Sequence, residues 1–391
     1  MPLFTLEAVR AKHGDSLILH YGKEDEPRFI LIDGGPPTVY RTFLRPRLAE
    51  IKDHWYPEEP LPLEMVMVSH IDADHIAGIL DLTKELIEKE DNPLCDIAVL
   101  WHNSFDEVVG NRKKDLFSEL PKEVVTAGLE DVLPEGFKPE ERHIAAVAAS
   151  VGQGRRLRRN AESLGIPTND PFMGLVSSET TIQGSKKLAK FNWGDGLTLT
   201  VLGPNRERIE KLHEKWEKEL KDKGPLEAVA AAYEDESPYN LSSIVVLAES
   251  EGKTMLLTGD ARGDDILKAL KDAKLLENGP LKVDLLKMPH HGSHHNIDTD
   301  FFEQVIADHY VLSGDGGFGN PEEDALNMIV QSRQDDDFTL WLTYREGREG
   351  LQEKLDKFLA ARKRKKRKYG VEFCGDGENS LKIDLLGKVE Y

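Results

Sequence analysis

The chain has 391 residues, of which 39% are hydrophobic and 31% are charged, and its formal net charge is −20 at pH 7. This composition excludes a disordered chain, and no run of about 18 apolar residues is present that could cross a membrane. The two cysteines, Cys95 and Cys374, are too few for a disulfide framework or a four-cysteine zinc site, and the first residues lack the apolar core of a signal peptide, so we expect a cytoplasmic protein that binds no membrane.

The first hundred residues alternate between predicted strands and a helix. Short apolar runs at 5–11, 16–21 and 28–33 are separated by polar turns, and a strand of the buried type follows at 64–70. Apolar residues then recur at helical spacing to about residue 90, and another apolar run lies at 95–101. Strands that alternate with a helix are typical of a layered α/β domain.

The pattern changes in the middle of the chain and then returns to strands. Residues 103–190 are more polar and mainly helical in pattern, 197–204 form a predicted strand, and 205–236 begin with a charged amphipathic helix. Apolar strands resume between 237 and 345. A helix from Gly350 to about Lys368 and two short strands complete the predicted elements.

The densest group of metal-ligating residue types is Ser69-His70-Ile71-Asp72-Ala73-Asp74-His75, where a strand ends and a helix begins. Alternation along the strand predicts that His70 and Asp72 point to one side, and the turn brings Asp74 and His75 round to the same cavity. Such a group needs a partner, because buried charges are costly without one. A divalent cation such as zinc meets this need; the alternative is a solvated turn in which an aspartate caps the helix.

Two later segments place similar side chains directly after apolar strands. Asp260 ends the run Leu256-Leu257-Thr258-Gly259-Asp260, and a histidine-rich segment reads Met288-Pro289-His290-His291-Gly292-Ser293-His294-His295. Each has a structural alternative, a helix cap for the aspartate and a polar surface loop for the histidines. Because open α/β sheets bind ligands beyond the carboxyl ends of their strands, three such segments together indicate a metal-dependent active site.

With these motifs, the sequence resembles the metallo-β-lactamase-fold hydrolases, and most closely their ComEC-type branch, the hydrolase domain of bacterial DNA-uptake channels. The resemblance covers about residues 1–101 and 197–330 and also rests on Gly14-Asp15-Ser16, Leu31-Ile32-Asp33-Gly34-Gly35, Asn240-Leu241-Ser242-Ser243, Ser313 and Asn320-Pro321. It implies a four-layer αββα sandwich within the α/β class, formed as a single domain over residues 1–391.

The resemblance also divides the chain. The first half of the sandwich would lie at 1–101, and the second half at 197–204 and 237–345. The resemblance does not explain residues 103–190 and 205–236, whose pattern predicts helical insertions, the first of them a candidate surface for a protein partner. The remaining residues, 346–391, would form a basic helix and terminal strands.

A set of metal ligands follows from the same resemblance. His70 and Asp72 would hold one metal ion, Asp74, His75 and His291 would hold a second, and Asp260 would bridge them. Asp74 would also orient the nucleophile, and His290 would bind a phosphate or protonate the leaving oxygen. Behind these groups would lie Asp33, Asn240 and Asn320.

Two departures from the family pattern concern the first metal position. Asp72 stands where the commonest motif has a second histidine, a substitution seen in the ComEC-like branch. The histidine that usually completes this position is not apparent; Asn240 stands roughly there, and His102 and His143 are remote candidates. One or two zinc ions are therefore expected, and the carboxylates make manganese an alternative.

The function that this sequence favours is a metal-dependent hydrolase of phosphodiesters, a phosphodiesterase or nuclease that uses metal-bound hydroxide on nucleic acid or nucleotides. Arg155–Arg159 reads RRLRR, and a second basic run consists of Arg362, Lys363, Arg364, Lys365, Lys366, Arg367 and Lys368. These runs attract phosphate or are solvated helix faces. The alternatives are a small-ester hydrolase acting on phosphorylcholine-like, lactone or thioester groups, and a metal-stabilised interaction module.

Overall fold

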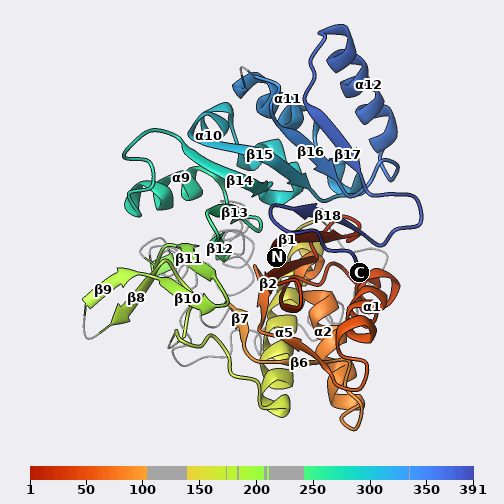
Figure 1. The fold of residues 1–391 in the computed structure, drawn as a ribbon, viewed down its shortest axis with the longest axis vertical. Helices are drawn as coiled ribbons and strands as arrows, with labels where there is room; N and C mark the ends of the chain where they lie inside the picture. The colour runs from red at the N-terminus through yellow and green to blue at the C-terminus, as the bar shows by residue number, and fades with distance from the viewer. Residues whose placement is uncertain (104–138, 173, 183–184, 207–208, 211–241, 334) are drawn as a thin grey trace.

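The computed structural model describes the whole chain except residues 104–138, 173, 183–184, 207–208, 211–241 and 334. It is a mixed α/β protein with several sheets and helices (Figure 1). Its strands are β1 (Pro2–Val9), β2 (Leu17–Lys23), β3 (Glu26–Ile32), β4 (Leu61–Leu63), β5 (Met65–Val68), β6 (Cys95–Ile97), β7 (Leu100–His102), β8 (Glu179–Ile182), β9 (Ser185–Leu188), β10 (Lys190–Gly194), β11 (Leu197–Gly203), β12 (Val245–Ser250), β13 (Lys253–Leu257), β14 (Leu281–Lys287), β15 (Val305–Leu312), β16 (Thr339–Leu342), β17 (Gly370–Phe373) and β18 (Ser380–Asp384).

Helices connect and cover these strands. The α-helices are α1 (Arg45–Trp55), α2 (Ala73–Glu88), α5 (Pro139–Leu164), α9 (Gly263–Asp272), α10 (Thr299–Gln304), α11 (Glu323–Ser332) and α12 (Leu351–Arg364). Short helical turns are η1 (Tyr40–Leu44), η3 (Pro289–Gly292), η4 (His294–Asn296) and η5 (Gly317–Gly319).

Two large sheets organise the fold. One has six strands in the order β18-β1-β2-β3-β5-β7, and the other has eight in the order β10-β11-β12-β13-β14-β15-β16-β17. The strands from β3 to β7 in the first sheet and from β13 to β17 in the second are parallel. In each sheet, the parallel strands therefore have their carboxyl ends on the same side, where the loops that follow them can bring polar groups together.

The two sheets face each other across a shared apolar core. Strand alternation divides their side chains, as in β13, where Met255 and Leu257 join the core between the sheets while Leu256 points to the opposite face. Beyond the first sheet, a second core contains residues of α1, α2 and α5. Beyond the other sheet, a third core contains residues of α9, α10, α11 and α12. Apolar burial thus accounts for both faces of each large sheet.

The last residues join both sheets. β17 pairs with β16 in the second sheet, and β18 pairs with β1 in the first. The two short strands predicted near the end of the chain are therefore confirmed as strands, and each adds an edge strand to a different sheet (Figure 1).

Two predicted stretches differ in detail from the structure. The run 95–101 forms two strands, because β6 pairs with β4 whereas β7 pairs with β5 of the large sheet. Segment 103–190 contains the helix α5 in its described part, but also the hairpin of β8 and β9. Most of the predicted helical stretch 205–236 lies outside the described residues.

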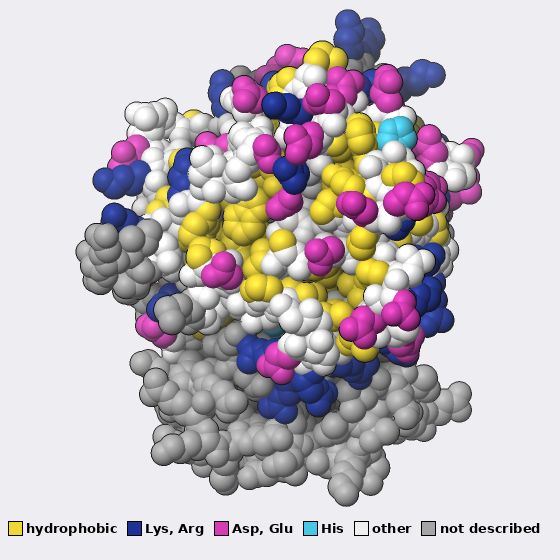
Figure 2. All heavy atoms as spheres, turned by 60° about the horizontal axis from the view of Figure 1, so that its bottom comes forward, with side chains coloured by type: hydrophobic (Ala, Val, Ile, Leu, Met, Phe, Trp, Pro, Cys, Tyr) yellow, Lys and Arg dark blue, Asp and Glu magenta, His cyan; other side chains and the backbone are white. Residues whose placement is uncertain are grey.

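Charges of both signs are interspersed with apolar side chains on the face drawn in Figure 2. The net charge of −20 disfavours nonspecific attraction to polyanions. Among the described residues, no helix is both long and apolar enough to cross a membrane.

Candidate metal centre

The candidate centre is assembled from five loops that follow strands of both sheets. Asp15 follows β1, Asp33 follows β3, and the segment 69–75 runs from β5 into the first turn of α2. Asp260 and His291 follow the neighbouring parallel strands β13 and β14. The fold therefore brings the three predicted motifs together at strand ends.

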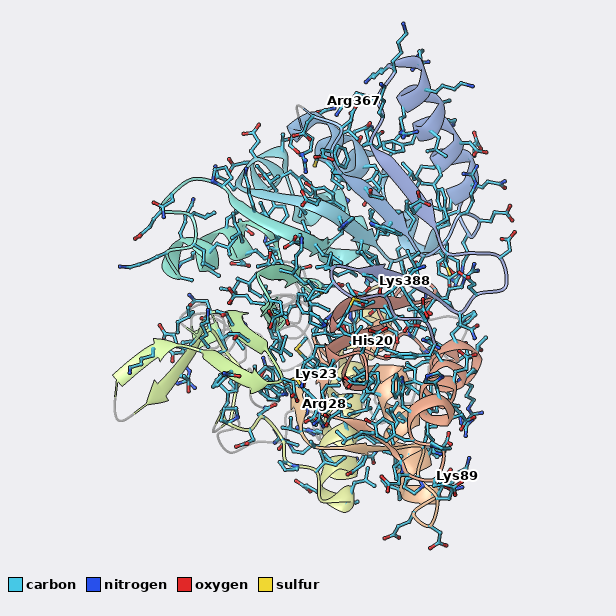
Figure 3. The ribbon with its side chains drawn as sticks, viewed as in Figure 1. His20, Lys23, Arg28, Lys89, Arg367 and Lys388 are labelled. Carbon is cyan, nitrogen blue, oxygen red and sulfur yellow. The ribbon has the colours of Figure 1, made fainter. Side chains whose placement is uncertain are left out.

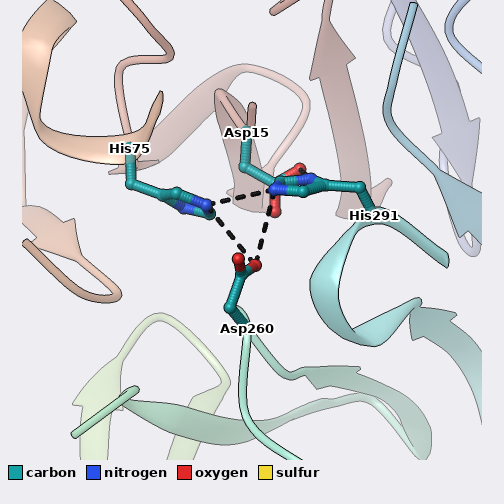
Figure 4. Close-up of side chains that lie close together, drawn as sticks. All are labelled: Asp15, His75, Asp260 and His291. Atoms are coloured by element: carbon teal, nitrogen blue, oxygen red, sulfur yellow. Dashed lines mark hydrogen bonds and ion pairs between the residues drawn. The ribbon is translucent and has the colours of Figure 1, made fainter. Parts of the chain in front are cut away.

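Asp260 lies in the middle of the centre and faces imidazoles with both of its oxygens. Its Oδ1 is 3.4 Å from His75 Nε2 and 3.5 Å from His291 Nε2 (Figure 4). Its Oδ2 is 3.6 Å from His70 Nε2 and 3.5 Å from His290 Nε2. One carboxylate is thus shared by two pairs of imidazoles, as a group that bridges two cations would be.

Two further carboxylates lie near the imidazoles, Asp74 beside His75 and His291, and Asp72 beside His70. Asp74 Oδ2 lies 3.5 Å from His291 Nε2 and 3.9 Å from His75 Nε2. Asp72 Oδ2 lies 3.8 Å from His70 Nε2. The six predicted ligands are therefore brought together, and about a quarter of each of the Asp72 and Asp74 side chains remains open to solvent.

Asp33 holds His75 from behind. Its Oδ2 lies 2.8 Å from His75 Nδ1, and it also accepts a hydrogen bond from Ser69 Oγ at 2.6 Å. Its Oδ1 accepts a bond of 2.7 Å from the Ser69 backbone N–H. A carboxylate on Nδ1 fixes the imidazole so that Nε2 faces Asp260, the arrangement that orients many metal-ligating histidines.

Asp15 supports His291 partly through Ser313, whose Oγ lies 3.2 Å from His291 Nδ1. Its Oδ1 lies 3.4 Å from His291 Nδ1 and accepts a hydrogen bond from Ser313 Oγ, while its Oδ2 lies 2.7 Å from Lys287 Nζ. Asp15 could be counted with His75, Asp260 and His291 as a ligand on proximity alone. Because both of its oxygens are engaged by buried partners, we assign it to the support of His291.

The backbone places these groups in unusual conformations. His290 and His291 have φ values of 47° and 54°, in the left-handed region, and Asp33 has φ 58°. Residues other than glycine rarely adopt this backbone conformation. They do so mainly where the surrounding structure enforces it, often at functional sites. Gly78 in α2 packs on Gly34 so tightly that a Cβ there would lie 1.9 Å from the Gly34 oxygen, which sets α2 against the Asp33 loop.

The electrostatics of the centre differ between its histidines. Burial lowers the pKa of His70 to about 3, with His75 adding to the effect. Burial also acts on His75 and His291, but carboxylates led by Asp260 outweigh it and raise the pKa of both, that of His291 to about 9. The pKa of Asp260 falls well below its ordinary value because the surrounding imidazoles overcome its burial.

The residues present fit a divalent cation. His70 Nε2 and Asp260 Oδ1 are buried without a hydrogen-bond partner among the described residues, and leaving such groups unpaired is costly. Imidazole nitrogens with carboxylate oxygens form a donor set that suits zinc, and manganese where carboxylates predominate. The chain therefore has a buried His/Asp group able to hold metal.

The other predicted residues are placed as follows. His290 is partly exposed, with 32% of its side chain accessible, and Asn320 Nδ2 lies 3.5 Å from its carbonyl oxygen. His102 lies near α5, where burial and Arg158 lower its pKa to about 3, and it belongs to none of the described groups of possible metal ligands. Asn240 and the side chain of His143 lie outside the described residues.

The basic run contains partly buried and exposed cations. Arg362 and Arg367 lie over the Tyr369 ring, and Arg367 also forms an ion pair with Asp336. Figure 3 labels Arg367, which follows the carboxyl-terminal end of α12. The exposed members are Lys363, Arg364, Lys365, Lys366 and Lys368. Two of the seven cations thus have structural partners.

Two residues of the centre were not assigned a role from the sequence. Asp15 belongs to the Gly14-Asp15-Ser16 motif of the resemblance, which marked it without indicating its partner. Lys287 immediately precedes the histidine-rich segment that begins at Met288, and a lysine at the end of an apolar strand was the available signal. A buried lysine requires a carboxylate partner, but its identity depends on the tertiary fold.

The sequence of this chain is similar to known proteins only over a short stretch. No family model matches the chain. A stretch of 112 residues, 28% of this chain, is 30% identical to microtubule-associated protein 1A of Mus musculus, and the match spans 4% of that protein.

Solved structures are similar only at a low level. CmlA, a diiron β-hydroxylase from Streptomyces venezuelae, aligns over 98% of this chain and 55% of its own, with 11% identity and a TM-score of 0.38. A protein of Parabacteroides distasonis described as a metal-dependent hydrolase aligns over 86% of this chain and 92% of its own, with 10% identity and a TM-score of 0.34. Because these TM-scores are low, the functional argument rests on the metal centre itself.

Proposed function

We propose that this protein is a metal-dependent hydrolase of phosphodiesters with nucleic acid or nucleotides as substrates. The observation that carries the proposal is the Asp260 carboxylate, whose two oxygens face separate imidazole pairs at 3.4–3.6 Å. Two cations about 3.5–4 Å apart, bridged by one group, are a common arrangement in phosphoester hydrolysis. The paired sheets with helices beyond each are consistent with the αββα metallo-β-lactamase sandwich and its ComEC-type branch, which we include in the proposal.

The proposed ligands divide into two positions. His75, His291 and Asp74 form one with Asp260, and His70 and Asp72 form the other with the same aspartate. Zinc is the ion we propose, with manganese as the alternative. When bound, such a cation lowers the pKa of a water molecule and supplies hydroxide at neutral pH.

The side chains of the centre would position the reacting groups. Asp74 is partly open to solvent, so a carboxylate oxygen can accept a hydrogen bond from the attacking water and fix its direction. His290 is exposed on one side, so its ring can donate a hydrogen bond to a phosphate oxygen or a proton to the leaving oxygen. Both groups lie next to Asp260 and therefore at the place where the phosphate would bind.

The exposed part of the basic run supports a polyanionic substrate. Lys363, Arg364, Lys365, Lys366 and Lys368 extend from the end of α12 on a protein whose net charge is strongly negative. A local group of cations attracts phosphates by counterion release. We propose that this group guides nucleic acid in the cytoplasm, and that the 103–190 segment is available to a protein partner.

One experiment tests the proposed function. The purified protein is analysed for metals by emission spectroscopy, and its hydrolysis of bis-p-nitrophenyl phosphate is measured before and after removal of metal with dipicolinate. We expect one or two equivalents of zinc or manganese, loss of turnover in the apoprotein, and recovery when either ion is returned. Bound metal with no turnover on phosphodiesters, but turnover on lactones or thioesters, would establish the small-ester activity instead. Bound metal with turnover on none of them would favour an interaction module.

A further inference from the structure

Phe318 is an exposed aromatic residue on strained backbone. Its accessibility is 78%, the highest among the described large hydrophobic residues, of which Met1 is the next. Its φ is 55°, in the left-handed region, and it stands between Gly317 and Gly319 in η5. A phenylalanine in this conformation is an outlier, and the cost is of the order of 1–3 kcal/mol for such strain.

This side chain gains little from folding. Burial of an aromatic ring would stabilise the protein, but most of this ring remains in water. Its ring contact is with His13, edge to face, at a centroid distance of 5.2 Å. A strained residue that exposes an apolar ring is therefore explained better by a ligand than by stability.

The ring lies close to the metal centre. His13 immediately precedes Gly14 and Asp15, and the Asp15 backbone N–H lies 3.3 Å from the Asp74 carbonyl oxygen. Burial lowers the pKa of His13 while the carboxylate of Asp74 opposes that shift, so the ring of His13 lies within the field of a proposed ligand. On the other side of Phe318, the Asn320 side chain approaches the backbone of His290.

The loop that carries Phe318 is held in place from three sides. Asp315 Oδ1 accepts a hydrogen bond of 3.0 Å from the Gly317 backbone, and the Gly316 backbone donates one of 3.0 Å to Asn320. Lys354 of α12 donates to the Pro321 carbonyl at 3.1 Å. Because the loop is already held in one conformation, the Phe318 ring can bind a ligand without the entropy cost of ordering the loop.

A cation stands beside the same loop. Arg348 Nε lies 3.1 Å from Asp315 Oδ2, and about half of its side chain remains exposed. Arg348 and His13 flank the same turn, because a Cβ added at Gly316 would lie 2.1 Å from the Arg348 carbonyl oxygen and one added at Gly317 would lie 2.9 Å from His13 Cβ. An arginine here would attract a phosphate and repel a quaternary ammonium group.

We propose that Phe318 is a stacking platform for a nucleobase next to the scissile phosphodiester, with Arg348 beside it for an adjoining phosphate. This inference rests on the proposed function and specifies its substrate class. A flat exposed ring binds any base through its face, so the platform would give affinity for nucleotides with little sequence preference.

Matched substrates can isolate the stacking. Thymidylyl-(3′→5′)-thymidine and the same diester without its bases share the phosphate and sugars. We expect Phe318→Ala to lower kcat/KM for the dinucleotide by about tenfold, as base–aromatic stacking predicts, and to leave the value for the abasic diester unchanged. Phe318→Trp should restore the activity, and Ile87→Ala, which removes an exposed apolar side chain from α2, should change neither value.

A binding measurement separates this inference from the proposed function. Tryptophan fluorescence of Phe318→Trp should be quenched by thymidine 5′-monophosphate more than that of the wild type. If the wild type hydrolyses neither diester but this quenching occurs, the proposed function fails and the platform stands. Equal loss of activity on both diesters, no difference in quenching, or a loss confined to phosphocholine esters would each overturn the platform.

Discussion

The ammonium of Lys287 lies 2.7 Å from Oδ2 of Asp15, and both side chains are almost completely buried. The other oxygen of Asp15 faces Nδ1 of His291 at 3.4 Å. Burial alone would raise the pKa of Asp15, but Lys287 and His291 outweigh it and hold the pKa below its ordinary range. Lys287 therefore keeps charged the carboxylate that orients a proposed metal ligand.

Removal of this ammonium should weaken metal binding. We expect Lys287→Met to reduce metal affinity about 10- to 100-fold, because partners of metal-ligating histidines have effects of this size. Stability should fall by about 3–5 kcal/mol, since Asp15 would remain buried without its partner. Competition with a chromogenic chelator measures the affinity, and denaturant unfolding measures the stability.

The double variant Lys287→Met with Asp15→Asn supplies the comparison for this prediction. It should recover part of the stability, because no uncompensated charge is left, but not the metal affinity. Lys253→Met is the control, since Lys253 forms a surface ion pair of 2.7 Å with Asp284 and should change stability by about 1 kcal/mol or less. Unchanged metal affinity in Lys287→Met would show that the pair serves only folding.

The sequence was informative where a signal is local. The run 69–75 combines strand, turn and helix in one stretch, and its four ligating groups are indeed together in the structure. The position of Lys287 is different, because its pairing with Asp15 joins residues 272 positions apart (287 − 15). No periodicity relates two such residues, and only the packing of β14 against the loop after β1 brings them into contact.

Local sequence patterns also could not predict which strands pair with each other. The two final strands were predicted from their apolar residues, yet β17 and β18 join different sheets. Likewise, the apolar run 95–101 gave no sign that it divides into β6 and β7. Hydrophobic periodicity reports which residues are buried, whereas the choice of neighbouring strand depends on contacts distant in sequence.

Loss of the shared carboxylate should affect the whole centre. We expect Asp260→Ala to reduce metal content below one equivalent and to abolish hydrolysis, because this aspartate faces all four imidazoles. Emission spectroscopy and bis-p-nitrophenyl phosphate turnover measure the two effects. Asp284→Ala, at a partly buried aspartate of β14, is the control. Full metal occupancy with wild-type turnover in Asp260→Ala would contradict the assignment.

The two metal positions should have unequal affinities. His75 Nδ1 lies 2.8 Å from the buried Asp33 carboxylate. His291 Nδ1 lies 3.2 Å from Ser313 Oγ and 3.4 Å from the buried Asp15 carboxylate. His70 Nδ1 has the Ser69 hydroxyl at 3.3 Å and, among the described residues, no carboxylate partner. A preorganised ligand binds metal more tightly, so His291→Ala should remove the tight site and His70→Ala the weak one. Calorimetric titration of the apoprotein measures both. Two equally tight sites would indicate a further ligand, and His290, 3.5 Å from Asp260 Oδ2, should then be tested first.

A buried ion pair outside the centre should govern stability in acid. Glu7 lies 2.8 Å from His20 Nε2 and 2.5 Å from Arg47 Nε. Burial opposes its ionisation, but His20 and Arg47 together hold its pKa well below the ordinary value of 4.5. The stability that Glu7 contributes is therefore present above about pH 4.5 and is lost as the pH falls towards its pKa in the folded protein.

Substitution of Glu7 tests this dependence. We expect Glu7→Gln to cost about 3–5 kcal/mol at pH 7, where Arg47 loses a buried partner. The difference from the wild type should shrink below pH 4.5, because the Glu7 carboxyl of the unfolded wild type then binds a proton that the folded protein does not bind, which lowers the stability of the wild type. Urea unfolding from pH 3 to 7 measures it, with the exposed Glu24→Gln as control. A difference independent of pH would contradict the assigned pKa shift.

The basic run should matter only for long substrates. Arg362 and Arg367 are engaged with Tyr369 and Asp336, so the cations free to meet phosphate are Lys363, Arg364, Lys365, Lys366 and Lys368. Neutralising Lys363, Arg364, Lys366 and Lys368 with glutamine should raise KM for a polynucleotide and leave hydrolysis of a small chromogenic phosphodiester unchanged, because the small substrate needs the metal centre alone. The advantage of the wild type over this variant on the polynucleotide should also shrink as salt rises from about 50 to 200 mM, since counterion release then contributes less.

The variant Arg367→Gln is the control for this prediction, and it should lower stability through the loss of its ion pair. Equal loss on both substrates would indicate a structural role for the run, and no loss on either would leave it a solvated helix end.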